Sequence, residues 1–154
     1  MSEAPTNVWK VDCQPDEDWG PGVRGERLLE RPPGTRLVSA VWELDAGARS
    51  PKYHCHHAAE EMLVVLSGEA VLRTPAGERP LQEGEVAHFP VGAAGAHEVI
   101  NRSKGTVRYL MIAAHSPLDV IEYIDESRIV VYSHADSIIQ PGGLFFSHEV
   151  ADDP

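Results

Sequence analysis

Turn-forming residues recur about every 8 to 15 positions between Leu37 and Ala113, and this rhythm constrains the fold more than any other feature. Glycine, proline, serine and acidic residues cluster at 45–47, 67–68, 75–77, 83–84, 90–92 and 103–105. The segments between these clusters show no helical periodicity of useful length, but they are long enough for strands. The spacing therefore predicts an all-β sandwich or barrel.

The segments between the turns carry strand patterns. Residues 38–44 show apolar side chains at every second position, which is typical of a strand with one buried face. The run 62–66 is continuously apolar, and 70–72, 86–89, 98–100, 107–113 and 129–132 are further segments rich in apolar side chains. Segment 118–126 is compatible with a short helix or with another strand.

We expect three regions along the chain. Residues 1–35 are rich in glycine, proline and acidic side chains, which predicts an irregular N-terminal arm. Residues 36–115 contain most of the strand patterns and form the expected β-barrel core. Residues 116–154 are expected to be a C-terminal extension that packs on the barrel or on a dimer partner.

Charge and composition disfavour several classes of function. The formal net charge of −11 disfavours binding to nucleic acids and to anionic membranes. No apolar run approaches the ~20 residues of a membrane-spanning helix. The two cysteines, Cys13 and Cys55, cannot form a disulfide framework of the kind found in small secreted proteins. A soluble cytoplasmic protein is the expectation.

A group of histidines and one glutamate predicts a metal site. His54 and His56 are two positions apart, so they point to the same face of an extended strand. Glu61 begins the next apolar run, and His97 follows the glycine-containing segment 92–95. Three imidazoles and one carboxylate suit one divalent transition metal ion. Around an octahedral ion, these four ligands would leave two positions for water or substrate.

Other residues near this set have competing interpretations. Glu60 is the alternative carboxylate, although an exposed surface role fits it better. His57 either supports a ligand or faces solvent, and Cys55 points away from the ligand face and fits a small packed residue. His88 is the candidate catalytic acid or base, with a packed or rim histidine as the alternative.

The same residues resemble the two motifs of the cupin superfamily. In the first motif, a glycine precedes an HxH pair, and a glutamate and a second glycine follow; Gly47, His54, His56, Glu61 and Gly68 take these places. Only Glu61 keeps six residues before Gly68, which favours it over Glu60. In the second motif, the matching residues are Gly84, Pro90, Gly92, His97 and Asn101. Two loops are longer than the pattern: six residues instead of five separate Gly47 from His54, and four instead of two separate Gly92 from His97.

The resemblance is closest to small, single-domain conserved-barrel cupins. It implies a double-stranded β-helix, or jelly-roll barrel, in which His54, His56, Glu61 and His97 bind Mn, Fe, Ni or Zn. It also implies a metal-dependent enzyme of the dioxygenase, isomerase or lyase type that acts on a small metabolite. A non-catalytic small-molecule-binding or sensing cupin is the alternative. Since such cupins commonly pair, a homodimer is expected.

Overall fold

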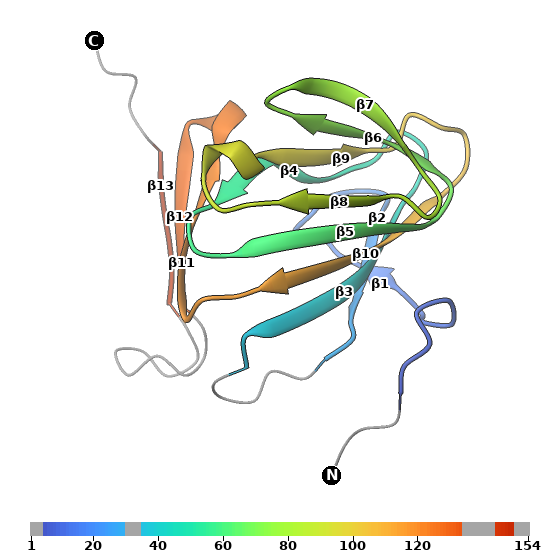
Figure 1. Cartoon of the computed structure of the whole chain (residues 1–154), viewed down its shortest axis with the longest axis horizontal. Helices are drawn as coiled ribbons and strands as arrows, with labels where there is room; N and C mark the ends of the chain where they lie inside the picture. The colour runs from blue at the N-terminus through green and yellow to red at the C-terminus, as the bar shows by residue number, and fades with distance from the viewer. Residues whose placement is uncertain (1–4, 30–34, 134–143, 150–154) are drawn as a thin grey trace.

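The computed structural model describes residues 5–29, 35–133 and 144–149, and in these ranges more than half of the residues lie in strands (Figure 1). The strands are β1 (Gln14–Pro15), β2 (Val23–Arg27), β3 (Leu37–Leu44), β4 (Arg49–His56), β5 (Glu60–Ser67), β6 (Glu69–Thr74), β7 (Gly77–Gln82), β8 (Val86–Phe89), β9 (His97–Ile100), β10 (Val107–Ala114), β11 (Leu118–Tyr123), β12 (Arg128–Ser133) and β13 (Leu144–Glu149). Two 3₁₀ turns, η1 (Ala93–Gly95) and η2 (Ile124–Glu126), complete the described elements.

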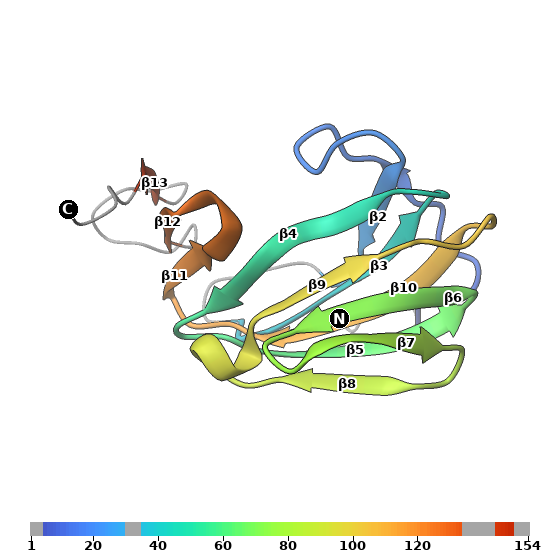
Figure 2. The same cartoon turned by 90° about the horizontal axis from the view of Figure 1, so that it is seen from above.

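The strands form two antiparallel sheets that wrap around a common interior (Figure 2). One sheet has the order β1-β2-β3-β10-β5-β8, and the other has the order β13-β12-β11-β4-β9-β6-β7. Several neighbours, such as β3 with β10, β5 with β8 and β4 with β9, come from distant parts of the chain, as in a jelly roll. The prediction of an all-β jelly-roll barrel is confirmed.

Side chains from both sheets fill the interior of the barrel. The buried apolar cluster contains Leu44, Leu63, Val65, Leu72, Leu81, Val99, Val107 and Tyr109, none more than 2% exposed. Along β10, buried and partly buried residues alternate because successive side chains in a strand point to opposite faces. Leu63 and Val65 anchor β5 in this core and Val99 anchors β9, while β4 is held by its pairing with β9 and β11.

The N-terminal arm requires a correction, because it is not wholly irregular. Val23–Arg27 forms β2, which pairs antiparallel with β3 and extends that sheet. Gly25 had suggested a break, but here it makes room for a neighbour: a Cβ at this position would lie 2.6 Å from the ring of Trp42. Trp19 packs edge-on against the same ring, with centroids 6.0 Å apart. The arm therefore covers Trp42.

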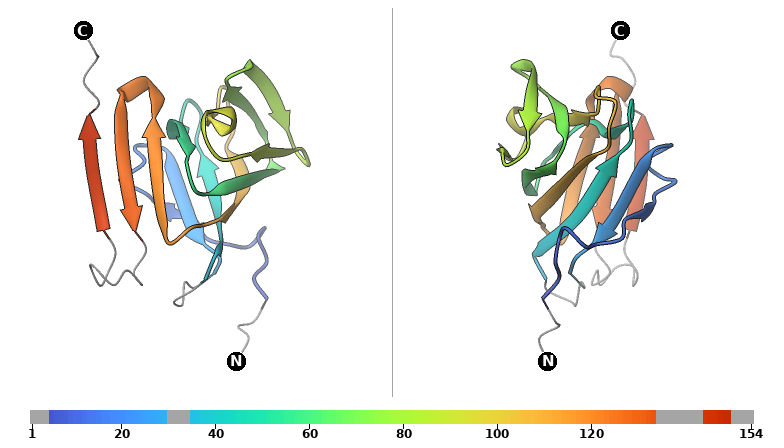
Figure 3. Two further views of the ribbon diagram at one scale, coloured as in Figure 1. Left: turned by 60° about the vertical axis from the view of Figure 1, so that its left-hand side comes forward. Right: turned by 90° about the vertical axis from the view of Figure 1, so that its right-hand side faces the viewer.

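The C-terminal extension continues the sheet that carries β4. Segment 118–126, for which helix and strand were both open, consists of strand β11 followed by the short turn η2. Residues 121–123 of β11 pair with residues 54–56 of β4. Figure 3 shows β11, β12 and β13 side by side, with β13 farthest from the barrel. None of the helical segments in the described ranges has the length and hydropathy of a membrane span.

Candidate metal centre

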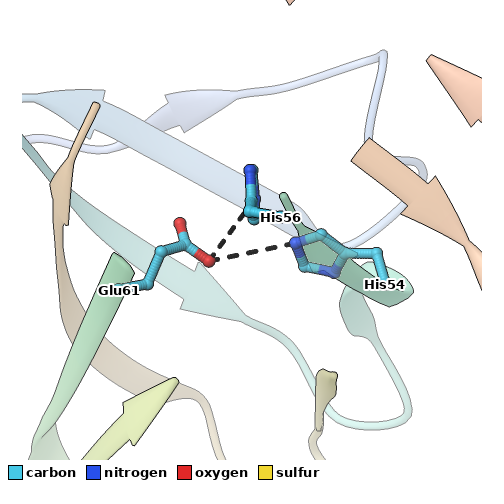
Figure 4. A group of neighbouring side chains, drawn as sticks. All are labelled: His54, His56 and Glu61. Carbon is cyan, nitrogen blue, oxygen red and sulfur yellow. Dashed lines mark ion pairs between the residues drawn. The ribbon is translucent and has the colours of Figure 1, made fainter. Parts of the chain in front are cut away.

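Three strands bring the four predicted ligands together inside the barrel. His54 and His56 lie on β4, Glu61 lies near the start of β5, and His97 begins β9. His97 is the direct cross-strand partner of His54, so the second motif meets the first through the pairing of β4 with β9. Figure 4 shows His54, His56 and Glu61 pointing toward one another.

The ligand atoms converge on one carboxylate oxygen. Oε2 of Glu61 lies 3.4 Å from Nε2 of His97, 3.5 Å from Nε2 of His56 and 4.0 Å from Nε2 of His54. The ligand atoms of His54, His56 and Glu61 lie within 4.8 Å of one another. The four side chains are at most 11% exposed, so the group is withdrawn from bulk water.

Backbone carbonyls determine which imidazole nitrogens face the centre. Nδ1 of His54 lies 2.9 Å from the carbonyl of Lys52, and Nδ1 of His97 lies 2.9 Å from the carbonyl of Gly95. A carbonyl can only accept a hydrogen bond, so both Nδ1 atoms must carry the proton. In a neutral imidazole this leaves Nε2 with its lone pair, which is the form that binds a metal.

Burial keeps these two imidazoles neutral. It lowers the pKa of His97 to about 4, and it lowers the pKa of His54 well below its usual range, with repulsion from the other histidines adding to the effect. Burial also raises the pKa of Glu61. For His56, burial lowers the pKa, but the hydrogen bond to Asp119 and the negative charges of Glu61 and Asp119 together outweigh it and raise the pKa.

Two buried polar atoms in this group have no partner in the described structure, namely Oε2 of Glu61 and Nε2 of His97. A buried polar atom without a hydrogen bond is costly, and here a carboxylate oxygen and an imidazole lone pair face each other. A bound cation would remove this conflict by accepting electron pairs from both. The donor set of three nitrogens and one oxygen therefore fits a divalent transition metal.

Asp119 supports one of the ligands from outside the predicted set. Its Oδ2 lies 2.5 Å from Nδ1 of His56, and its Oδ1 accepts backbone N–H groups from Ala58 and Val120. A carboxylate in this position fixes the ring orientation and increases the basicity of the other nitrogen. Sequence reasoning missed Asp119, which lies in a segment without a recognisable motif.

We predict that Asp119→Asn weakens metal binding about 10- to 100-fold, the usual cost of losing such a supporting carboxylate. The Oδ1 of asparagine can still accept the N–H groups of Ala58 and Val120. Its NH₂ group, which takes the place of Oδ2, cannot accept a hydrogen bond from Nδ1 of His56. Metal affinity measured by competition with a chelator tests this. Asp125→Asn, which removes an ion pair with Arg73 elsewhere on the surface, is the matched control. Equal affinities of the two variants would contradict the prediction.

The long loop before His97 is an organised part of the site. Its extra residues form η1, and the N–H of Gly92 donates to the carbonyl of His56 at 2.7 Å. Gly92 has a φ of 77°, a conformation that favours glycine. The carbonyl of Gly95 then accepts from His97. Phe89 stacks on the His97 ring with centroids 3.6 Å apart, so the loop connects both motifs and fixes this imidazole.

The other residues singled out in the sequence lie away from the group formed by the four predicted ligands. Glu60 is exposed, and His88 is exposed on β8. Cys55 is buried on the other face of β4, where its Sγ lies 3.9 Å from a carboxylate oxygen of Glu122. His57 also contacts Glu122, at 3.0 Å. Asn101 caps the turn after β9, because its amide donates to the carbonyls of Leu44 and Gly105.

In comparison with known protein families, residues 40–113 match a model described as a cupin domain. Among solved structures, the chain is similar to a sugar phosphate isomerase of a cupin superfamily from Silicibacter pomeroyi. That similarity has 26% identity and a TM-score of 0.70, and it covers 81% of this chain and 76% of that one. A protein from Acidithiobacillus ferrooxidans, provisionally named a sugar phosphate isomerase, has 26% identity, a TM-score of 0.65 and coverages of 78% and 71%.

The fold also occurs in proteins of other activity. A polyketide cyclase from Streptomyces resistomycificus has 22% identity, a TM-score of 0.60 and coverages of 73% and 79%. At this identity the similarity concerns the fold alone. No curated protein matches the sequence.

Proposed function

This chain belongs to the cupin superfamily through its residues 40–113, and we propose that it is a metal-dependent enzyme acting on a small, oxygen-rich metabolite. The observation that carries the proposal is the convergence of Nε2 of three histidines on Oε2 of Glu61, with two of these atoms buried and unpartnered. Mn, Fe, Ni and Zn are the candidate ions, since all accept imidazole and carboxylate ligands.

Four side chains would hold the ion that polarises the substrate. His54, His56, Glu61 and His97 would bind the ion, which when bound supplies a Lewis acid for substrate oxygens. Phe89 covers one face of His97 and helps to exclude water. Substrate oxygens would have to approach through the positions that these four ligands leave open.

Tyr123 is the candidate group for holding a proton beside the substrate. It is buried, its ring stacks on His54 with centroids 5.9 Å apart, and it lies close enough to Glu61 to interact electrostatically. Burial raises the pKa of its hydroxyl above the usual value of 10, so the hydroxyl stays protonated at neutral pH. A neutral phenol can donate a hydrogen bond to a developing oxyanion.

Isomerisation of a phosphorylated sugar is the first reaction class to test, because two structures named for that activity share 26% identity with the chain over most of their length. The experiment restores Mn, Fe, Ni or Zn to metal-free protein and follows a panel of aldose and ketose phosphates by NMR. We expect interconversion by the wild type and by Glu60→Gln, and loss of it in Glu61→Gln. Turnover by metal-free protein, or by Glu61→Gln at the wild-type rate, would overturn metal-dependent catalysis.

A non-catalytic small-molecule-binding cupin is the second candidate. It is favoured by the hydrogen bonds of the three ligand histidines, since each Nδ1 already contacts a carbonyl or a carboxylate and is not free to transfer protons. His88, the other histidine considered for catalysis, is exposed on β8. Saturable binding of a sugar phosphate without conversion, with every metal, would favour this function over the first.

A further inference from the structure

Strand β4 continues into a second group of metal-ligating side chains on its opposite face. His54 and His56 point into the barrel, so Cys55, which lies between them, points outward. His57 follows just beyond the strand, and its N–H still donates to the carbonyl of Val120 on β11 at 2.9 Å. The sheet pairing is therefore kept at this end, and Cys55 and His57 share one face.

β11 supplies a third group at the same position. Glu122 is the direct cross-strand partner of Cys55. Its Oε2 lies 3.0 Å from Nε2 of His57 and 3.9 Å from Sγ of Cys55, and Sγ lies 4.0 Å from Nε2 of His57. The sulfur, nitrogen and oxygen atoms thus all lie within 4.8 Å of one another.

These separations are close to those of a tetrahedral zinc site. Bond lengths of ~2.3 Å to sulfur and ~2.0–2.1 Å to nitrogen and oxygen place neighbouring ligand atoms about 3.3–3.6 Å apart. The two distances to sulfur exceed this range by only a few tenths of an ångström, and the carboxylate can move because Glu122 is 45% exposed. Side-chain rotation alone could therefore bring the three atoms into coordination.

The surroundings also suit an ion that enters from solvent. Cys55 is 1% exposed and packs with Tyr53 and Ala96 in a buried apolar cluster. The side chains of His57 and Glu122 are each 45% exposed, so the opposite side of the group is open. Such a site holds three protein ligands and leaves a fourth position to water.

We propose that Cys55, His57 and Glu122 form a second metal site of the zinc class, on the outer face of the sheet and separate from the group inside the barrel. The two sites differ in chemistry. The inner one offers only nitrogen and oxygen, whereas the outer one includes a thiolate, which favours zinc and other ions with affinity for sulfur. An ion at the outer site would connect β4 with β11.

The test uses Co²⁺ as the probe, because a thiolate bound to cobalt gives a near-ultraviolet charge-transfer band that nitrogen and oxygen ligands do not give. Full-length metal-free protein is titrated with Co²⁺ beyond two equivalents. We expect the band in the wild type, in Cys13→Ser and in the inner-site variant His97→Ala. We expect its loss in Cys55→Ser and in the double variant His57→Ala/Glu122→Gln, whose altered side chains are half-exposed and leave the core intact.

Three results would overturn the proposal. The first is a wild-type protein without the band at saturating Co²⁺, which would make the His57–Glu122 contact a simple surface ion pair. The second is a band that survives in Cys55→Ser and disappears in Cys13→Ser. The third is an unchanged band and affinity in the double variant. Circular dichroism of each variant verifies that the fold is kept.

Discussion

Replacing His97 with alanine is expected to reduce the inner metal from one ion per chain to almost none. The substitution removes a buried imidazole whose Nε2 lies 3.4 Å from Oε2 of Glu61 and has no hydrogen-bond partner among the described residues. The remaining ligands would be held by β4 and β5 alone, because His97 is the only predicted ligand on β9. Every sample carries Cys55→Ser, which removes the outer site. Elemental analysis after dialysis then measures the loss of the inner metal.

Thermal unfolding gives an independent readout of the same change. A ligand that binds only the folded state stabilises it by about 2.7 kcal/mol when its concentration is 100 times Kd. We expect added metal to raise the melting temperature of the parent protein and to leave that of His97→Ala unchanged. The variant also loses the stacking of Phe89 on the imidazole, so its metal-free form should melt at a lower temperature. The metal-dependent shift separates this packing loss from the loss of binding.

His88→Ala is the matched control, since His88 is an exposed histidine on the neighbouring strand β8. It should keep the metal and the full thermal shift. His97→Ala with an unchanged metal content would exclude His97 as a ligand. Glu61→Gln offers a second variant of nearly the same shape, should the alanine substitution prevent folding.

The second large effect is expected at Gly95, in the turn that precedes His97. A Cβ built at this position would lie 1.7 Å from the carbonyl oxygen of Pro90 and 2.8 Å from its carbonyl carbon. Both contacts are to backbone, so a side-chain rotation cannot relieve them. We expect Gly95→Ala to lower the free energy of unfolding by about 3 kcal/mol. Metal affinity should fall as well, because the carbonyl of Gly95 orients His97.

Gly105→Ala is the control for this experiment. Gly105 lies in the turn after β9, and a Cβ there would have nothing within 4 Å. Its substitution should change the free energy of unfolding by no more than about 0.5 kcal/mol. Urea denaturation in the presence of a chelator compares the two proteins without any contribution from metal. If Gly95→Ala were as stable as Gly105→Ala, the tight packing of the turn against Pro90 would be refuted.

The inner group illustrates what a sequence can predict about a site. His54 and His56 could be assigned to one face because alternation along a strand is a local property. Glu61 could be distinguished from Glu60 by its distance to Gly68, where a turn begins the next strand. The structure accordingly places Glu61 beside the histidines and leaves Glu60 exposed.

The features of the site and fold that the sequence did not predict depend on contacts between segments that are distant along the chain. Asp119 lies 63 positions after His56, and only the pairing of β11 with β4 brings them together. No local pattern in the sequence distinguishes this buried carboxylate from that of an exposed aspartate. Similarly, β2 was missed because Gly25 looks like a break in the sequence. Its role becomes visible only when the Trp42 ring is seen to occupy the space.

The contact between Asp119 and His56 makes the C-terminal extension a reporter of what happens inside the barrel. Asp119 can increase the basicity of His56 only while its strand, β11, is paired with β4. If the pairing of β11 with β4 strengthens metal binding inside the barrel, then metal binding must strengthen this pairing by the same free energy. Metal binding in the interior and the docking of residues 118–123 on β4 would therefore form one thermodynamic cycle, in which loading of the barrel stabilises the pairing of β11.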